Sequence, residues 1–180
     1  VNTIADGTAV KTPGSNIFPY IKKNLDDIIT VEDDELIVAF LDMVENHKMI
    51  VENSGLLTVA ALKHLGVKDK RVVSILSGGN MDVITMSSVV QQGLIFRDRI
   101  FTVSVLLPDK PGELAKVAQT LADVQGNVIK LEHNQFVTTN RSAAVELRIT
   151  LECFGTEHKE QIIAALEKKG YKPRIVRTMI

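Results

Sequence analysis

The pattern of apolar and polar residues is clearest in the second half of the chain. Apolar and polar residues alternate over 100–107, which is the pattern of a half-buried strand. After a turn at 109–112, apolar residues recur at three- and four-residue spacing over 114–122, which predicts one face of a helix. Gly126 is expected to end this helix as its C-terminal cap, and residues 128–131 begin a second strand.

The remainder of this half repeats the same form. Residues 142–154 alternate like a strand, residues 157–169 have the apolar spacing of a helix, and residues 171–179 predict a last strand. The predicted order is therefore βαββαβ, which is the ferredoxin-like split βαβ arrangement.

The first half alternates predicted helices with short strands. Helices are expected at residues 16–24, 33–48, 54–65 and 82–92. A run rich in β-branched residues at 26–31 predicts one strand, and the continuous apolar run 72–76 predicts a buried parallel strand. This alternation indicates an α/β domain. Two or three strands are too few for a sheet covered on both faces, as though the chain had been cut from something longer.

These patterns predict two domains, for which 180 residues give enough length. We expect residues 1–93 to be an incomplete α/β domain, residues 94–98 to be a linker, and residues 99–180 to be the ferredoxin-like domain.

Composition excludes several classes of function. The chain has 21 basic and 22 acidic residues, which gives no electrostatic basis for binding nucleic acid or an anionic membrane. No apolar run approaches the roughly 20 residues of a membrane span. Cys153 is the single cysteine, so no internal disulfide can form, and its place in a predicted strand favours a role in the core. The four histidines lack metal-ligand spacing. We expect a cytoplasmic protein without a metal site.

The turn between the first strand and helix of the second domain has the chemistry of a ligand site. A helix that begins at Pro111 leaves backbone N–H groups unpaired at its first turn, where a carboxylate binds favourably. Gly112 allows close approach to the backbone. Asp109 can accept from an ammonium group, and Asn127 can both donate and accept. The plainer alternative is an ordinary turn at Pro111-Gly112 and an ordinary cap at Asn127.

The motif D-K-P-G-E-L at residues 109–114, followed by G-N-V-I at 126–129, resembles the ACT domain, a small-molecule-sensing module. The resemblance covers nearly all of residues 99–180. It implies that two copies pair edge to edge and bind an effector between the first loop of one copy and the second strand of the other. The implied effector-binding residues are Asp109, Pro111, Gly112, Glu113, Leu114, Asn127, Val128 and Ile129.

In the first half, the motif S-G-G-N at residues 77–80 follows the predicted buried strand. It places a hydroxyl group at the carboxyl end of a parallel sheet, where open α/β sheets bind ligands. Together with segments 3–14, 26–36 and 51–57, in this order, it resembles the C-terminal part of the catalytic domain of the threonine ammonia-lyases, or threonine dehydratases. These are pyridoxal-phosphate enzymes of fold type II, with the tryptophan-synthase-β-like fold, and many carry one ACT domain at the C-terminus.

The resemblance implies roles in binding pyridoxal 5'-phosphate for four residues. Ser77 matches the serine that hydrogen-bonds the pyridine nitrogen, and Gly78 follows it in the same loop. Gly7 matches a glycine whose backbone lies close to the ring, and Glu52 matches a position near the ring. The sequence N-S-G at 53–55 departs from the commoner family pattern, which leaves the contact at the ring edge open.

One essential part of the family pattern is missing. The Schiff-base lysine of the family lies in an S-x-K-x-R-G-like segment, and the phosphate lies in a glycine-rich loop; neither occurs in this sequence. We therefore predict no catalytic residue in this chain and no activity for the chain alone.

The resemblance implies a parent enzyme that converts L-threonine to 2-oxobutanoate and ammonia, as a homo-oligomer regulated through its ACT domain. Two alternatives remain open. The first is a non-enzymatic ACT sensor of amino acids, and the second is a dehydratase for L-serine. The effector is expected to be an amino acid, isoleucine or valine, or a nucleotide such as AMP.

Overall fold

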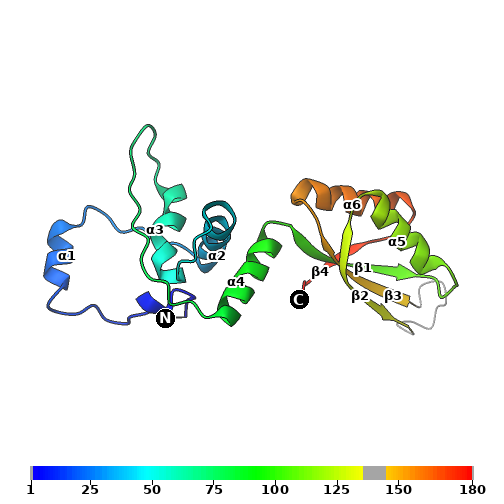
Figure 1. Cartoon of the computed structure of the whole chain (residues 1–180), viewed down its shortest axis with the longest axis horizontal. Helices are drawn as coiled ribbons and strands as arrows, with labels where there is room; N and C mark the ends of the chain where they lie inside the picture. The colour runs from blue at the N-terminus through cyan, green and yellow to red at the C-terminus, as the bar shows by residue number, and fades with distance from the viewer. Residues whose placement is uncertain (1, 136–144, 180) are drawn as a thin grey trace. The chain divides into compact units, whose positions relative to one another are not determined.

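The computed structural model describes residues 2–135 and 145–179. The chain divides into two compact units, Val1–Gly93 and Leu94–Ile180 (Figure 1). Helix α4, Val83–Phe96, includes the first three of the five residues expected to form the linker. The exact domain boundaries stay a prediction.

The second unit is built on a four-stranded antiparallel sheet. Its elements in chain order are β1 Ile100–Leu107, α5 Glu113–Asp123, β2 Asn127–Asn134, β3 Val145–Glu152, α6 Thr156–Lys168 and β4 Arg174–Val176. The strand order across the sheet is β2-β3-β1-β4. Both helices lie on one face of the sheet, and none of the described residues forms a helix on the other face (Figure 1). This arrangement confirms the predicted βαββαβ fold; the predicted strand residues 142–144 lie outside the described residues.

The core of this unit follows from the alternation that the sequence shows. Every second residue of β1 and β3 faces the helices, because successive side chains of a strand point to opposite faces. In register, Val103 lies opposite Ile149, and neither is exposed to solvent. The two helices contribute Val117 and Leu121 from α5 and Ile162 and Leu166 from α6. Cys153 belongs to the same core, as predicted, and its burial raises the pKa of its thiol.

The end of helix α5 differs from the prediction. Gln125, not Gly126, adopts the left-handed conformation, with φ of 59°. The Gly126 N–H donates to the Leu121 carbonyl at 2.9 Å, which is the bond that closes such a helix end. Gly126 itself packs against α6, since an added Cβ would lie 3.3 Å from Ile162 Cδ1.

All regular secondary structure in the described part of the first unit is helical, and its elements are joined by long irregular segments. Its elements before α4 are the 3₁₀ turns η1 Asp6–Thr8, η3 Asn53–Leu56 and η4 Ala61–His64, the helices α1 Phe18–Asn24, α2 Asp33–Asp42 and α3 Leu57–Ala60, and the π-helical turn η2 Met43–His47. Glu32 and Glu35 form a capping box at the start of α2. The core packs around Phe40 and Leu56, which are fully buried. The four predicted helices are thus present, with shifted ends.

The two strands predicted for this unit do not form. Neither residues 26–31 nor residues 72–76 are part of a strand, and the described residues of this unit contain none. Most of their apolar side chains are exposed; Ile28 is 73% exposed, Val73 88% and Ile75 74%. Val31 and Leu76, at the ends of the two runs, are partly buried against the core. A strand has no hydrogen bonds of its own and forms only beside another strand. An apolar run of this kind therefore becomes a strand only where another strand lies beside it.

Candidate functional site

The first candidate site lies where the turn before η3 meets the S-G-G-N loop, within the first unit. The Glu52 N–H donates to the Gly78 carbonyl at 3.4 Å. In return, the Asn80 N–H donates to Glu52 Oε2 at 3.2 Å. Two segments that are distant in the sequence are therefore joined by one residue, Glu52, through its backbone and its carboxylate.

Two glycines allow this close contact. Gly78 has φ of 78°, and an added Cβ would lie 2.1 Å from Glu52 Cδ and 2.4 Å from its Oε1. An added Cβ at Gly55 would lie 1.7 Å from the Ser77 carbonyl oxygen. Glycine is needed at both positions because the S-G-G-N loop lies directly on the backbone of η3 and on the Glu52 carboxylate.

Gly7 brings a third segment to the same place. An added Cβ at Gly7 would lie 2.8 Å from Ser54 Oγ and 3.6 Å from Glu52 Oε1. The four residues expected to bind the cofactor, Gly7, Glu52, Ser77 and Gly78, thus gather around one carboxylate. Ser77 is exposed on the surface of this cluster.

The sequence did not predict a role for Ser54, although it lies in the segment that departs from the family pattern. Its Oγ is buried and makes no hydrogen bond, and the same holds for Oδ1 of its neighbour Asn53. An unpaired buried polar atom costs roughly 1–3 kcal/mol, so such atoms mark positions where a further partner is expected. The donor and acceptor groups of this cluster suit a polar heterocycle better than a cation, because Glu52 is the only carboxylate among the residues named.

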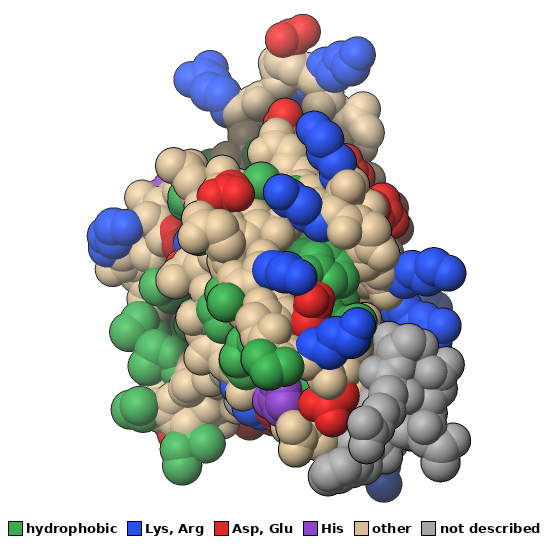
Figure 2. Space-filling view, turned by 90° about the vertical axis from the view of Figure 1, so that its right-hand side faces the viewer, with side chains coloured by type: hydrophobic (Ala, Val, Ile, Leu, Met, Phe, Trp, Pro, Cys, Tyr) green, Lys and Arg blue, Asp and Glu red, His purple; other side chains and the backbone are tan. Residues whose placement is uncertain are grey.

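The second candidate site is a cavity of about 260 Å³ where β1 runs into α5. Five of the predicted effector residues line it: Asp109, Pro111, Gly112, Glu113 and Leu114. The end of β2 and the residue after it add His133 and Gln135, which the sequence patterns did not single out. Figure 2 shows the side of the molecule that lies at the right of Figure 1, where Lys and Arg side chains are interspersed with Asp, Glu and apolar side chains.

The charges at the start of α5 are partly paired. Lys116 Nζ lies 2.7 Å from Glu113 Oε1, and its hydrogen bond to Glu113, together with the negative charge there, raises the pKa of Lys116. Gly112 precedes the helix with φ of 88°, and an added Cβ there would meet nothing within 4 Å. The backbone of the first turn is therefore open to a ligand.

The other three predicted effector residues do not lie at this cavity. Asn127 begins β2 opposite Glu152, and Glu152 in turn lies opposite Ile100, the first residue of β1. The cavity follows Leu107, the last residue of β1. A strand of eight residues separates the two ends by roughly 24 Å. Val128 and Ile129 follow Asn127 on the sheet edge and are 39% and 45% exposed.

Comparison with known families identifies both units. Residues 1–78 match the model of the pyridoxal-phosphate dependent enzymes, and residues 101–170 match the model of the ACT domain. The class of protein is thus a pyridoxal-phosphate enzyme segment followed by an ACT domain. The curated relatives below that match almost the whole chain are threonine ammonia-lyases and threonine dehydratases.

Several curated relatives match almost the whole chain. The L-threonine ammonia-lyase of Geobacter sulfurreducens is 38% identical over 171 residues, which are 94% of this chain and 42% of the relative. That of Thermotoga maritima is 34% identical over 97% of this chain and 44% of the relative. The biosynthetic L-threonine dehydratase of Pasteurella multocida is 31% identical over 95% of this chain and 33% of the relative. The chain spans less than half the length of these relatives.

Among solved structures, the chain is similar to a prephenate dehydratase from Staphylococcus aureus, with a TM-score of 0.35 and 22% identity over 43% of this chain and 29% of that chain. Within the described ranges, no helix is both long and apolar enough to cross a membrane. No group of three or more His, Cys, Asp or Glu side chains in the described part of the chain could hold a metal ion.

Proposed function

We propose that these residues are the regulatory end of a pyridoxal-phosphate dependent threonine ammonia-lyase. The reaction of the whole protein converts L-threonine into 2-oxobutanoate and ammonia, with one water lost in the elimination and one taken up when ammonia is released. The observation that carries this proposal is the 38% identity to an L-threonine ammonia-lyase over 94% of the chain, across both units. L-Serine is the alternative substrate.

The cluster around Glu52 suits one edge of the cofactor ring. The cofactor, when bound, withdraws electrons from the α-carbon of the substrate. We assign to Ser77 a hydrogen bond with the ring nitrogen; a hydroxyl group, unlike a carboxylate, leaves that nitrogen largely unprotonated. Glu52 orients the loop through the Asn80 N–H. The unpaired Ser54 Oγ supports the fit, and so does the close approach of the segments around Glu52 that Gly7 and Gly78 allow.

The effector site is proposed to need two copies of the ACT unit. Among the strands of the described residues, β2 is at the edge of the sheet and pairs with β3. If two copies pair antiparallel along β2, the first residue of one strand lies beside the last residue of the other. Asn127 of one copy then lies at the cavity of its partner, close to Gly112. Pairing along β2 would thus bring the start of β2 of one copy, with Asn127, to the effector cavity of the other copy.

The test compares the 180-residue chain with the natural polypeptide that contains it. Each is incubated with pyridoxal 5'-phosphate and L-threonine or L-serine, and 2-oxobutanoate and pyruvate are measured. We expect 2-oxobutanoate from the natural polypeptide. We expect no product from the 180-residue chain, because it carries no segment like the lysine segment of the family. If neither makes an oxo acid, the non-enzymatic sensor replaces the enzyme.

A further inference from the structure

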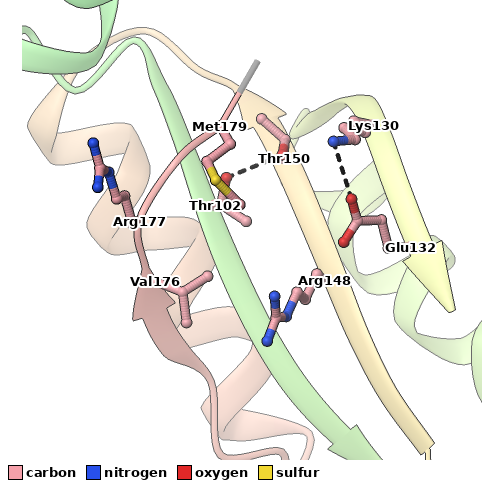
Figure 3. Close-up of a pocket in the computed structure, with 8 residues that line it drawn as sticks. All are labelled: Thr102, Lys130, Glu132, Arg148, Thr150, Val176, Arg177 and Met179. Atoms are coloured by element: carbon pink, nitrogen blue, oxygen red, sulfur yellow. Dashed lines mark hydrogen bonds and ion pairs between the residues drawn. The ribbon is translucent and has the colours of Figure 1, made fainter. Parts of the chain in front are cut away.

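A second cavity, of about 160 Å³, lies in the ACT unit on the sheet face that carries no helix (Figure 3). It is distinct from the effector cavity, with which it shares no lining residue. Four residues in register form a row across all four strands of the sheet: Lys130, Thr150, Thr102 and Val176. Glu132 and Arg148 are a second in-register pair, next to this row.

The floor of the cavity is a pair of buried hydroxyl groups. Thr102 and Thr150 are only 5% and 4% exposed, and their Oγ1 atoms lie 3.0 Å apart. Each hydroxyl has one proton, and their mutual bond uses one of the two. The other proton remains for a further acceptor. Because both side chains line the cavity, an acceptor inside it can take that proton.

The charged side chains around the cavity favour a ligand with a single negative charge. Lys130 pairs with Glu132 at 3.0 Å. Arg148 donates from Nε to Glu146 at 3.1 Å, which leaves the two terminal amino groups of the guanidinium for other acceptors. Arg177, also a lining residue, adds a third cation, so the lining holds three basic side chains and one carboxylate, Glu132.

The size and the apolar wall limit the ligand further. A cavity of roughly 150 Å³ holds a molecule of about six non-hydrogen atoms, such as benzene. Val176 and Met179 supply the apolar contacts, and Figure 3 shows Met179 beside Thr102 at one end of the cavity. Met179 is 65% exposed, so its side chain can move to admit a ligand.

We propose that this cavity binds a short-chain monocarboxylate, with its carboxylate toward Arg148 and the threonine pair and its aliphatic end against Val176 and Met179. The carboxylate accepts the remaining hydroxyl proton and the guanidinium N–H groups. An ammonium group is disfavoured, because Glu132, the carboxylate that lines the cavity, is already paired with Lys130 and the other basic side chains repel a cation. The inference goes beyond the proposed function and stands without it.

The test is a titration of the 180-residue chain with butyrate, which has six non-hydrogen atoms, at constant ionic strength. The methionine methyl groups are labelled with ¹³C and followed by NMR. Met179 lines the cavity, and the other four methionines, Met43, Met49, Met81 and Met86, lie in the first unit and serve as references. We expect a saturable shift of the Met179 signal alone, with a dissociation constant on the order of 1 mM.

Two variants and a matched control test the contacts. Arg148→Gln is expected to weaken binding about tenfold or more, and Thr150→Val, which keeps the volume, about fivefold. Arg174→Gln removes the same charge from β4 at an exposed residue outside the cavity and is expected to change binding less than about twofold. Unchanged binding in both cavity variants would overturn the proposal.

Related probes fix the chemistry of the ligand. 2-Oxobutanoate in place of butyrate distinguishes an oxo acid from a simple fatty acid, and saturable binding of either supports the site. L-2-Aminobutyrate and inorganic phosphate are expected to bind at least about tenfold more weakly. Equal or tighter binding of one of these two, or no saturable shift of Met179 with either carboxylate, would refute it.

Discussion

At the scale of single residues, the environment of Gly78 shows how one carboxylate determines a neighbour's identity. The loop crosses the Glu52 carboxylate so closely that a methyl group at Gly78 would overlap it, and the positive φ of Gly78 is itself unfavourable for other residues. Gly79, the next residue, has no such neighbour, since an added Cβ there would meet nothing within 4 Å. The two adjacent glycines therefore differ in what they allow.

This difference predicts unequal effects of two alanine substitutions. Gly78→Ala is expected to lower the free energy of unfolding of the first unit by about 1–3 kcal/mol, through steric overlap and an unfavourable φ. Gly79→Ala is the matched control and is expected to change it by less than about 0.5 kcal/mol. Urea unfolding followed by circular dichroism measures both. Equal effects of the two would show that the contact with Glu52 does not constrain the loop.

At the scale of elements, Asp98, which lies just before the first residue of β1, links that strand to helix α6. Its Oδ1 lies 2.6 Å from Lys159 Nζ, and its Oδ2 accepts from Thr156 Oγ1 at 2.9 Å. Lys159 also lies over the ring of Phe101, 5.7 Å from its centre. The hydrogen bond from Lys159 holds the pKa of Asp98 below its usual 3.8. The carboxylate is thus more stable in the folded chain than in the unfolded one.

The lowered pKa predicts how the stability contributed by Asp98 varies with pH. A depressed pKa contributes stability above the unfolded value of 3.8, and this contribution is lost as the pH falls below it. Asp98→Asn, which suits the φ of 52°, is expected to reduce the free energy of unfolding of the ACT unit by about 1–2 kcal/mol at pH 7.

The same comparison at about pH 3 is expected to show a smaller difference between the two proteins. Denaturant unfolding at several pH values measures it. Asp123→Asn, at an exposed acid on α5, serves as the control. A difference that is constant from pH 7 to pH 3 would exclude the ion pair as its source.

At the scale of the whole molecule, the proposed effector site depends on two copies of the chain. Within one copy, the loop at Gly112 and the start of β2 at Asn127 lie at opposite ends of the sheet. In a split βαβ fold, β1 and β2 run parallel with β3 between them, so the end of one is never beside the start of the other. Edge pairing along β2 is the arrangement that joins them.

This arrangement predicts which variants lose effector regulation in the natural polypeptide. Gly112→Asp places a negative charge where the proposed site would hold an anionic group, and Asn127→Ala removes an amide from the proposed partner's half of the site. Each is expected to raise the half-saturating concentration of the effector by about tenfold or more. The measurement is the ratio of activity with and without isoleucine, valine or AMP, recorded over a range of effector concentrations to give the half-saturating concentration. Effector binding unchanged in both variants would exclude this site.

Gly170→Asp provides a matched control for Gly112→Asp. Gly170 also has a positive φ, of 87°, and an added Cβ there meets nothing within 4 Å. It lies after α6, away from both cavities. Gly170→Asp therefore introduces the same backbone strain and the same charge outside the effector site. Its half-saturating effector concentration is expected to stay within about twofold of that of the unchanged protein.

The sequence alone determined the ACT fold, the helices of the first unit and the residue types of both candidate sites. Alternation in β1 and β3 and the spacing of apolar residues in α5 and α6 are local patterns, and each directly selects the face that is buried. The motifs around Ser77 and Gly112 indicated the resemblance to known families, because their residue types can be recognised without knowledge of their contacts.

Only the tertiary structure decided which of these patterns form and which residues meet. The apolar runs 26–31 and 72–76 have the composition of strands, but a strand needs a hydrogen-bonded neighbour, and no local pattern states whether one is present. The contact of Gly78 with Glu52 and the row from Lys130 to Val176 likewise join distant segments. Such contacts depend on chain topology and register, which is why they became visible only in the folded molecule.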